Sequence, residues 1–340
     1  MKKTVSLILA ALLLMCSVGV AFAADAGETY DSFGAYERVF IIGIDGLGAT
    51  FDMVDSPNFD RIFADNAYRY DAHTEYVTVS AQNWGSILTG VDYTTHGLTN
   101  DCCEDNERTS ADENNTIFYY ARQAFPDAQL VSFNNWDAIN HGIIENDLGV
   151  KKINRGTDPL VVDAILKYIN NEKNDPKLMF VQLDSVDHAA HTYGGFSQQY
   201  YDAAAKADVW LGEIYDAIEA RGFMENSLFI LVADHGETTD GHGGQTKEES
   251  SAVLAVAGHS VNATVLGENV QNRDVSAIAL YALGVEKPAH FISVVPEELF
   301  GESREKTVEP NPMKRATKLF RKFLYLFVRM VNLLVGIFDK

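Results

Sequence analysis

The sequence contains little cysteine. Three of its 340 residues are cysteines, and two of these, Cys102 and Cys103, are adjacent. Consecutive Cα atoms lie about 3.8 Å apart across a trans peptide, below the usual disulfide separation of roughly 4.4–6.8 Å. A strained bridge, an intermolecular link and a free pair all stay open, but a scaffold stapled by several disulfides is excluded. Stability must therefore come from a hydrophobic core.

Positive charge is also scarce. Lys and Arg number 27 against 48 Asp and Glu, which gives a formal net charge of −21. Because such a chain repels nucleic-acid phosphates, we expect no nucleic-acid-binding surface. A hydrophobic content of 46% and a charged content of 22% are ordinary for a folded protein. We find no internal repeat, and the length allows one large core or two smaller ones.

The first residues have the pattern of a secretory signal. Lys2 and Lys3 precede an apolar stretch at residues 5–15, and an A-x-A cleavage site follows at residues 21–23. We therefore expect residues 1–23 to be removed and the chain to be exported, to the periplasm or the extracellular space. A lipoprotein anchor on Cys16 is disfavoured, because Met15 is not the small residue that such a site prefers.

A basic and apolar tail is expected at residues 304–340. Its most apolar stretch, residues 323–338, has sixteen residues and contains Arg329 and Asn332, whereas a transmembrane helix needs about 20 apolar residues. An amphipathic helix at residues 314–338, lying on an anionic membrane, is favoured. A helix packed against its own domain and a true span remain the alternatives.

The hydrophobic pattern between these ends predicts alternating strands and helices. Strands are expected where apolar runs lack the alternation of half-exposed strands, at residues 39–44, 129–133, 178–183, 228–233 and 252–256. Helical stretches are expected at residues 83–89, 115–125, 159–170, 198–221 and 274–283. This order predicts an α/β fold, with a mainly parallel central sheet and helices on both faces.

Polar clusters follow or lie just beyond these apolar runs. An α/β sheet collects its ligand-binding groups there, at the carboxyl ends of its strands. Carboxylates and neutral imidazoles bind zinc-like ions, and two such ions can surround a nucleophilic hydroxyl. Seven side chains in these clusters are the candidates for such a site: Asp45, Ser80, Asp187, His191, Asp234, His235 and His242.

Single members of this set also have plain structural explanations. Asp45 can cap a helix, and Ser80 can be an ordinary N-cap serine. Thr78 is a competing hydroxyl two residues earlier. Asp184 and His188 repeat the acid–histidine spacing one turn out of phase, so spacing alone leaves the register open. Asp184 can also form a hydrogen bond to a metal-binding side chain and fix its orientation.

Four motifs carry a resemblance to a known family. They are IIGIDGLG at residues 41–48, SAQNWGSILTG at 80–90, D-x-x-x-H-x-x-G at 187–194, and DHG at 234–236 with HGG at 242–244. Together they resemble the alkaline phosphatase superfamily, most closely its type I phosphodiesterase/nucleotide pyrophosphatase branch. The resemblance extends over residues 39–284 and implies an alkaline-phosphatase-like fold. It makes residues 24–303 one metal-dependent phosphoesterase domain.

The resemblance also implies a role for each site residue. Ser80 stands where the nucleophile sits, and Asn100 lies close to the position of an Asn that contacts a phosphoryl oxygen, with Asp101 an equally close match. Two divalent ions are implied, zinc first and manganese as the alternative. One ion would be bound by Asp45, Asp234 and His235 and faced by Ser80, and the other by Asp187, His191 and His242.

These observations predict an exported two-metal phosphoric ester hydrolase, phosphodiesterase- or nucleotide-pyrophosphatase-like, that acts through a phosphoserine. Its substrate would be a small-molecule, nucleotide or lipid-headgroup phosphate ester. The block at 80–84 reads S-A-Q-N-W where the family often has T-F-P-N-H, and it lacks the Pro and Arg of the sulfatase signature. No Lys or Arg lies in residues 80–101, which favours diesters. The alternatives are a phosphomonoesterase, a phosphoethanolamine-type transferase and a non-catalytic metal-binding surface protein.

Overall fold

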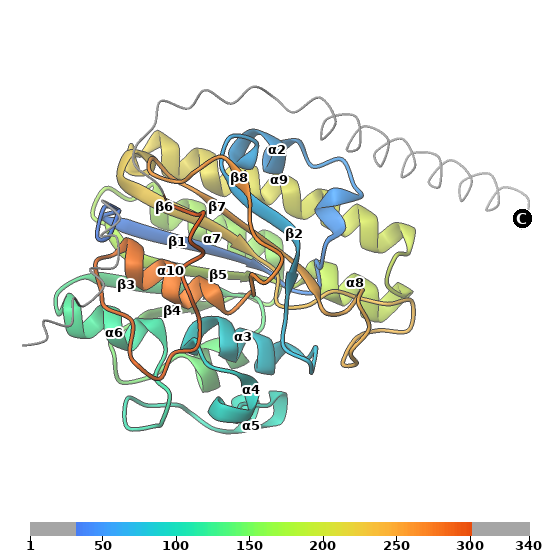
Figure 1. Ribbon diagram of the computed structural model, residues 1–340, viewed down its shortest axis with the longest axis horizontal. Coiled ribbons are helices and arrows are strands. Elements are labelled where there is room, and N and C mark those ends of the chain that lie inside the picture. Colours follow the sequence, from blue (N-terminus) through green and yellow to red (C-terminus); the bar gives the residue numbers. More distant parts are fainter. Residues whose placement is uncertain (1–31, 301–340) are drawn as a thin grey trace, which may run out of the picture. The chain divides into compact units, whose positions relative to one another are not determined.

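The structure is a computed structural model that describes residues 32–300. The expected signal peptide and the whole of the expected basic tail lie outside these residues. One sheet of eight strands, in the order β4-β3-β5-β1-β6-β7-β2-β8, forms the centre of the described chain (Figure 1). In chain order the strands are β1 (Arg38–Ile44), β2 (Ala67–His73), β3 (Gln129–Asn134), β4 (Lys151–Asn154), β5 (Pro176–Leu183), β6 (Ser227–Val232), β7 (Ser251–Ala257) and β8 (Thr264–Val265).

The strand directions confirm the expected mainly parallel sheet. β1 lies between β5 and β6 and is parallel to both, and β3 is parallel to β4 and β5. β7 is the exception, because it is antiparallel to both of its neighbours, β6 and β2. The carboxyl ends of β5, β1 and β6 therefore meet side by side at one edge of the sheet.

Helices cover both faces of the sheet (Figure 1). One layer consists of α3 (Ser80–Thr89), α6 (Ile117–Ala124) and α10 (Asp274–Ala282), and the other of α2 (Pro57–Phe63), α7 (Asp158–Ile169) and α9 (Gln198–Ala220). In β1, Val39 and Ile41 pack on the α3 side, whereas Phe40 and Ile42 pack on the α9 side. Each such side chain contributes about 1.5–3 kcal/mol on burial. Burial on both faces explains why the apolar runs do not alternate.

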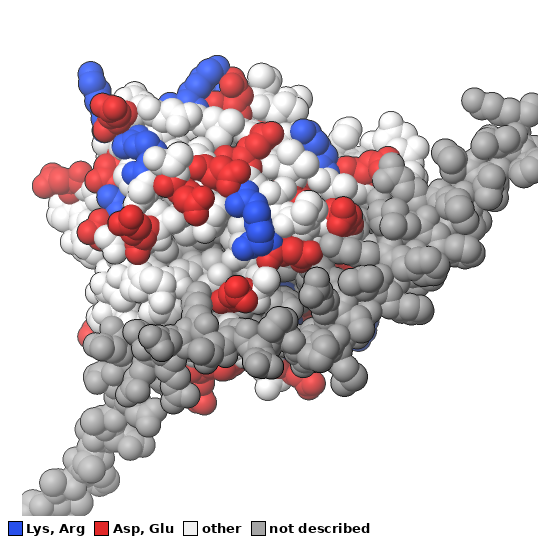
Figure 2. Space-filling view, turned by 90° about the horizontal axis from the view of Figure 1, so that it is seen from above, with Lys and Arg blue, Asp and Glu red and all other residues white. Residues whose placement is uncertain are grey.

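Shorter helices complete the described fold. They are α4 (Tyr93–His96), α5 (Asn100–Asp105), α8 (Ser185–Tyr193), η1 (Thr50–Asp52), η2 (Ile139–Ile143) and η3 (Phe223–Asn226). Cys102 and Cys103 lie in α5 as free thiols, so the vicinal bridge is not formed. Among residues 32–300 no helix has both the length and the hydropathy that crossing a membrane requires. On the face shown in Figure 2, basic side chains are interspersed among acidic ones.

Candidate metal centre

The predicted site residues meet at the carboxyl edge of the sheet. Asp45 directly follows β1, and Asp234 and His235 follow β6 after one intervening alanine. Asp187 and His191 lie on α8, which begins two residues after β5 ends. Because these three strands are parallel neighbours, side chains far apart in the sequence are brought together here.

The first cluster surrounds one ring nitrogen of His235. His235 Nε2 lies 3.4 Å from Asp45 Oδ1 and 3.3 Å from Asp234 Oδ2. Ser80 Oγ lies 3.4 Å from the same nitrogen. All three ligand-type side chains are buried, and their ligand atoms lie within 4.8 Å of one another. The nucleophile candidate is thus in contact with a group that can bind a cation.

Hydrogen bonds hold one oxygen of each aspartate and leave the other available. Asp45 Oδ2 accepts from Trp84 Nε1 at 2.8 Å and from Gln182 Nε2 at 3.0 Å. Asp234 Oδ1 accepts from the Gly46 amide at 3.1 Å. Asp45 Oδ1 and Asp234 Oδ2, the two oxygens beside His235, are buried and receive no donor from residues 32–300. Gly46 has φ = 63°, a conformation that favours glycine and that turns its amide toward Asp234.

The second cluster contains Asp187, His191 and His242. Asp187 Oδ1 lies 3.4 Å from His242 Nε2, and its Oδ2 lies 3.3 Å from His191 Nε2. The two histidine Nε2 atoms are 3.0 Å apart. His188, the alternative histidine of α8, is exposed, whereas Asp187 contacts both His191 and His242. His191 is the outermost member, since 57% of its side chain is exposed.

The loop that carries His242 is held by Thr78. The Thr78 carbonyl lies 2.6 Å from His242 Nδ1, and its hydroxyl accepts from the Gly243 amide at 2.9 Å. The same hydroxyl donates to the Gly244 carbonyl at 3.0 Å. Thr78 therefore orients the second cluster, and its hydroxyl is engaged by the loop, whereas that of Ser80 lies beside His235.

Ser80 occupies the N-terminus of α3. It was expected to precede this helix, but α3 begins at Ser80, and Val79 is the N-cap. The positive end of the helix dipole therefore faces its hydroxyl. Asn100 Oδ1 accepts from the Ala81 amide at 3.0 Å, which fixes the side-chain amide of Asn100 beside Ser80. Asp101, the other match to that position, is exposed.

Burial and like charge disfavour ionised carboxylates in this centre. Burial, followed by the charge of Asp45, raises the pKa of both Asp187 and Asp234. The same two causes raise the pKa of Asp184 to about 8. Burial lowers the pKa of His235 and His242, so both imidazoles are neutral, as metal ligands must be. Crowded carboxylates with free oxygens beside neutral imidazoles fit a pair of divalent cations.

Three further residues belong to this centre. Glu237 is buried, and its carboxylate lies within 4.8 Å of ligand atoms of Asp187, His235 and His242. Gln182 joins Asp45 to Asp184 through its Nε2 group. Trp84 is the third, through its bond to Asp45. The sequence carries one signal for Gln182, which is a lone polar residue inside the apolar run of β5.

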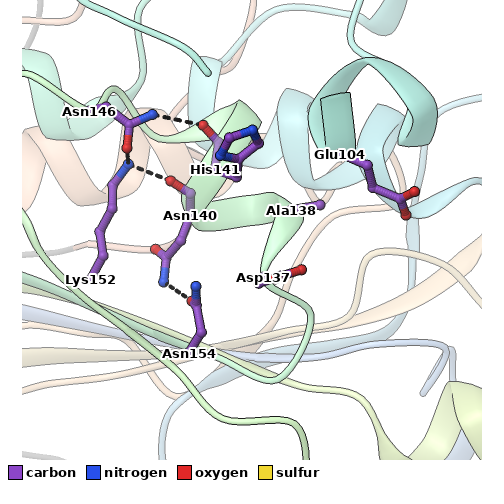
Figure 3. A pocket seen from close by; sticks show the side chains of 8 residues that line it. All are labelled: Glu104, Asp137, Ala138, Asn140, His141, Asn146, Lys152 and Asn154. Carbon is purple, nitrogen blue, oxygen red and sulfur yellow. Dashed lines mark hydrogen bonds between the residues drawn. The ribbon is translucent and has the colours of Figure 1, made fainter. Parts of the chain in front are cut away.

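A separate polar cavity of about 380 Å³ lies between α5, η2 and β4 (Figure 3). Lys152 lines this cavity, and burial lowers the pKa of its ammonium group to about 8. Lys152 Nζ donates to the carbonyls of Asn140 and Ile144 and to Asn146 Oδ1. These three acceptors use all three ammonium hydrogens, so Lys152 caps the end of η2 rather than offering its charge to a ligand.

Comparison with known proteins identifies the family. Residues 39–244, more than half of the chain, match the family described as type I phosphodiesterase / nucleotide pyrophosphatase. The chain belongs to this family. A curated relative, GPI ethanolamine phosphate transferase 1 of Candida glabrata, is 24% identical over 144 residues. That match covers 36% of this chain but only 16% of the relative, so the chain spans about a sixth of that protein.

Solved structures confirm the predicted fold. Murine ectonucleotide pyrophosphatase / phosphodiesterase 5 superposes with a TM-score of 0.60 and 12% identity, over 74% of this chain and 96% of that one. A 2-O GAG sulfatase superposes with a TM-score of 0.61 and 11% identity, over 81% of this chain and 76% of that one. The fold is therefore as expected, and the family match bears out the resemblance to the type I phosphodiesterase / nucleotide pyrophosphatase branch. The roles of the individual site residues stay predictions.

Proposed function

We propose that this protein is an exported phosphodiesterase, similar to nucleotide pyrophosphatases, that acts through a phosphoserine formed on Ser80. One observation supports this most directly: Ser80 Oγ lies 3.4 Å from His235 Nε2. That nitrogen is also within 3.4 Å of Asp45 and 3.3 Å of Asp234. A hydroxyl in this position is next to the place where a cation would bind.

Two divalent cations fit the centre, with zinc suited to the histidine-rich ligand set and manganese as the alternative. Asp45, Asp234 and His235 would hold one cation, and Asp187, His191 and His242 the other. When bound, the pair supplies positive charge that favours ionised serine and offsets the charge of the phosphoryl oxygens.

The residues of the chain supply the nucleophile and the positioning. As the Ser80 Oγ–P bond forms, the P–O bond to the leaving alcohol breaks. Water then displaces Ser80 from phosphorus and regenerates its hydroxyl. The N-terminus of α3 stabilises negative charge on Ser80. Asn100, oriented by the Ala81 amide, has two Nδ2 hydrogens to donate to a phosphoryl oxygen.

The charges around the centre favour diesters over monoesters. A diester carries one negative charge and a monoester up to two, and the second charge requires extra cationic groups. The segment from Ser80 to Asp101 has no Lys or Arg. The neighbouring charges that perturb Asp187 and Asp234 come from carboxylates and histidines. These carboxylates would therefore repel a dianionic monoester more strongly than a monoanionic diester.

Transfer of phosphoethanolamine to an alcohol is the second candidate function. It is favoured by the similarity to a relative named GPI ethanolamine phosphate transferase 1. The first half of the reaction would be the same, and an alcohol would replace water in the second. Product analysis with and without an added alcohol acceptor separates the two, because only a transferase forms the new ester.

The experiment compares purified wild-type, Ser80→Ala and Thr78→Ala proteins on bis-p-nitrophenyl phosphate and on p-nitrophenyl phosphate. We expect Ser80→Ala to retain its metal and lose turnover, and the wild type to prefer the diester. Acid-quenched wild type should carry phosphate on Ser80 by mass spectrometry. Turnover by Ser80→Ala together with loss of turnover by Thr78→Ala would instead assign the nucleophile to Thr78.

Export and membrane contact rest on the sequence alone. The basic start at Lys2 and Lys3 and the A-x-A site at residues 21–23 support cleavage after Ala23. The basic and apolar residues at 314–338 support binding to an anionic membrane surface. An unprocessed N-terminus on protein from the native host would contradict export. Equal sedimentation with anionic liposomes of the full chain and of a form ending at residue 303 would contradict membrane docking.

A further inference from the structure

Glu237 is a buried carboxylate without a hydrogen-bond donor. It is 1% exposed, and neither of its carboxylate oxygens receives a donor from residues 32–300. Its nearest basic atom is His235 Nδ1, at 3.9 Å from Oε1, and that nitrogen also lies 3.1 Å from the Gly236 carbonyl. An uncompensated buried charge costs several kcal/mol, so Glu237 must be neutralised. Burial raises the pKa of Glu237 to about 10, so a proton neutralises it in the metal-free protein, and a bound cation would take the place of that proton.

Other buried glutamates in the described chain are satisfied by nearby donors. Glu145, which is fully buried, accepts from the amide and the hydroxyl of Thr116 at 2.6 Å each. Glu249, 5% exposed, accepts from the amides of Gly244 and Thr246 at 2.7 and 3.0 Å. Both have the structural role that buried carboxylates usually have, which is to bind main-chain donors. Glu237 lacks such donors and lies instead among ligand-type atoms.

The backbone around Glu237 holds it against the second cluster. A Cβ at Gly195, just after α8, would lie 2.1 Å from the Thr238 carbonyl and 2.9 Å from Glu237 Cβ. Glycine at 195 therefore lets the segment after α8 press against residues 237–238. The ligand atoms of Asp187, His242 and Glu237 consequently lie within 4.8 Å of one another.

The charges of the centre balance when Glu237 is included. Asp45 and Asp234 belong to one cluster, and Asp187 and Glu237 to the other. These are two carboxylates per cluster, so two divalent cations would be neutralised by the four. Without Glu237 the second cation would have a single carboxylate, and a buried charge would remain uncompensated.

We propose that Glu237 is a ligand of the second divalent cation, together with Asp187 and His242, and that His191 completes the set from the exposed rim. The second site would then have two carboxylates, as the first has. This inference rests on the two-cation centre of the proposed function, but it concerns cation binding and not turnover.

The experiment titrates metal-free protein with Zn²⁺ by calorimetry and counts bound metal after gel filtration. Glu237→Gln keeps the shape and removes the charge. We expect it to bind one cation as the wild type does and to bind the second at least about 100-fold more weakly, since even partners behind a ligand are worth 10–100-fold. The Tm of the metal-free variant should stay within about 2 °C of the wild type, because the substitution keeps the shape of the side chain.

Glu145→Gln is the matched control, because it alters a buried glutamate outside the centre. It should lower the Tm of the metal-free protein and leave both cation affinities unchanged. Glu237→Asp, which keeps the carboxyl group but shortens the side chain, should also weaken the second site. A wild type that binds fewer than two cations, or a Glu237→Gln protein with wild-type affinity for both, would overturn the proposal. Two bound cations without any esterase activity would overturn the proposed function and leave this inference standing.

Discussion

The bond between Trp84 and Asp45 provides a sharp test of how the first cluster is built. Trp84 is fully buried, and its indole N–H donates to Asp45 Oδ2 at 2.8 Å. The ring fits because residue 43 is glycine: a Cβ there would lie 2.5 Å from Trp84 Cη2. Trp84→Phe keeps an aromatic ring in this space and removes the donor. Gln182 remains as the other partner of Asp45 Oδ2.

Two effects of this substitution can be estimated. A hydrogen bond to a charged group contributes about 1.5–3 kcal/mol, so the free energy of unfolding should fall by about that much. Loss of the donor leaves more of the carboxylate's negative charge for a metal, but it also frees the carboxylate to rotate away from His235. Partners of this kind are worth 10–100-fold in metal affinity, so we expect the loss of orientation to dominate.

The assay is calorimetric Zn²⁺ titration with urea unfolding of the same preparations. Trp210→Phe is the control, because Trp210 is a buried tryptophan on α9, 7% exposed, and outside both clusters. We expect the dissociation constant of one cation to rise 10–100-fold in Trp84→Phe and to stay unchanged in Trp210→Phe. Equal affinities in the two variants would show that Trp84 only fills space.

Two further predictions concern the scaffold. The Asp158 carboxylate accepts from the amides of Asp184 and Ser185 at 2.8 Å each, at the start of α8. Asp158→Ala should therefore lower the free energy of unfolding in urea by about 2–3 kcal/mol and weaken metal binding. Asp163 is exposed on α7, and Asp163→Ala, the control, should lower the free energy of unfolding by less than about 0.5 kcal/mol. Burial lowers the pKa of His96 to about 4, whereas in the unfolded chain its pKa is about 6.5. The neutral, buried His96 therefore contributes fully to the free energy of unfolding above pH 6.5, and this contribution is lost as the pH falls toward 4. Wild type should lose roughly 3 kcal/mol more unfolding free energy than His96→Gln between pH 7 and pH 4; equal losses would refute this assignment.

The strands that the sequence revealed are those buried on both faces. Residues 39–44, 178–183 and 228–233 lie within a residue or two of β1, β5 and β6, because continuous apolar runs are what a covered parallel strand requires. β2 was missed because four of its seven residues are half-buried and two, Arg69 and Asp71, are charged. β4, with the sequence KKIN, has a single apolar side chain and is held by its main chain. The reversed direction of β7 leaves no trace in its composition.

The convergence of the candidate site residues could be predicted because the sheet itself brings the ends of its strands together. Asp45 and Asp234 are placed by β1 and β6 with little help from loops. Glu237 could not be predicted in this way, because its burial depends on a contact with Gly195. Gly195 follows α8 and is far from Glu237 in the sequence. The engagement of Thr78 likewise depends on a loop whose course no local pattern encodes.

The two alternate residues Thr78 and Ser80 face different halves of the centre. Thr78 forms hydrogen bonds to the glycine-rich loop that contains His242, and Ser80 lies beside His235. One short stretch of backbone thus positions both the hydroxyl of Ser80 and the imidazole of His242. A substitution that reshapes the loop would therefore also displace the backbone two residues from Ser80.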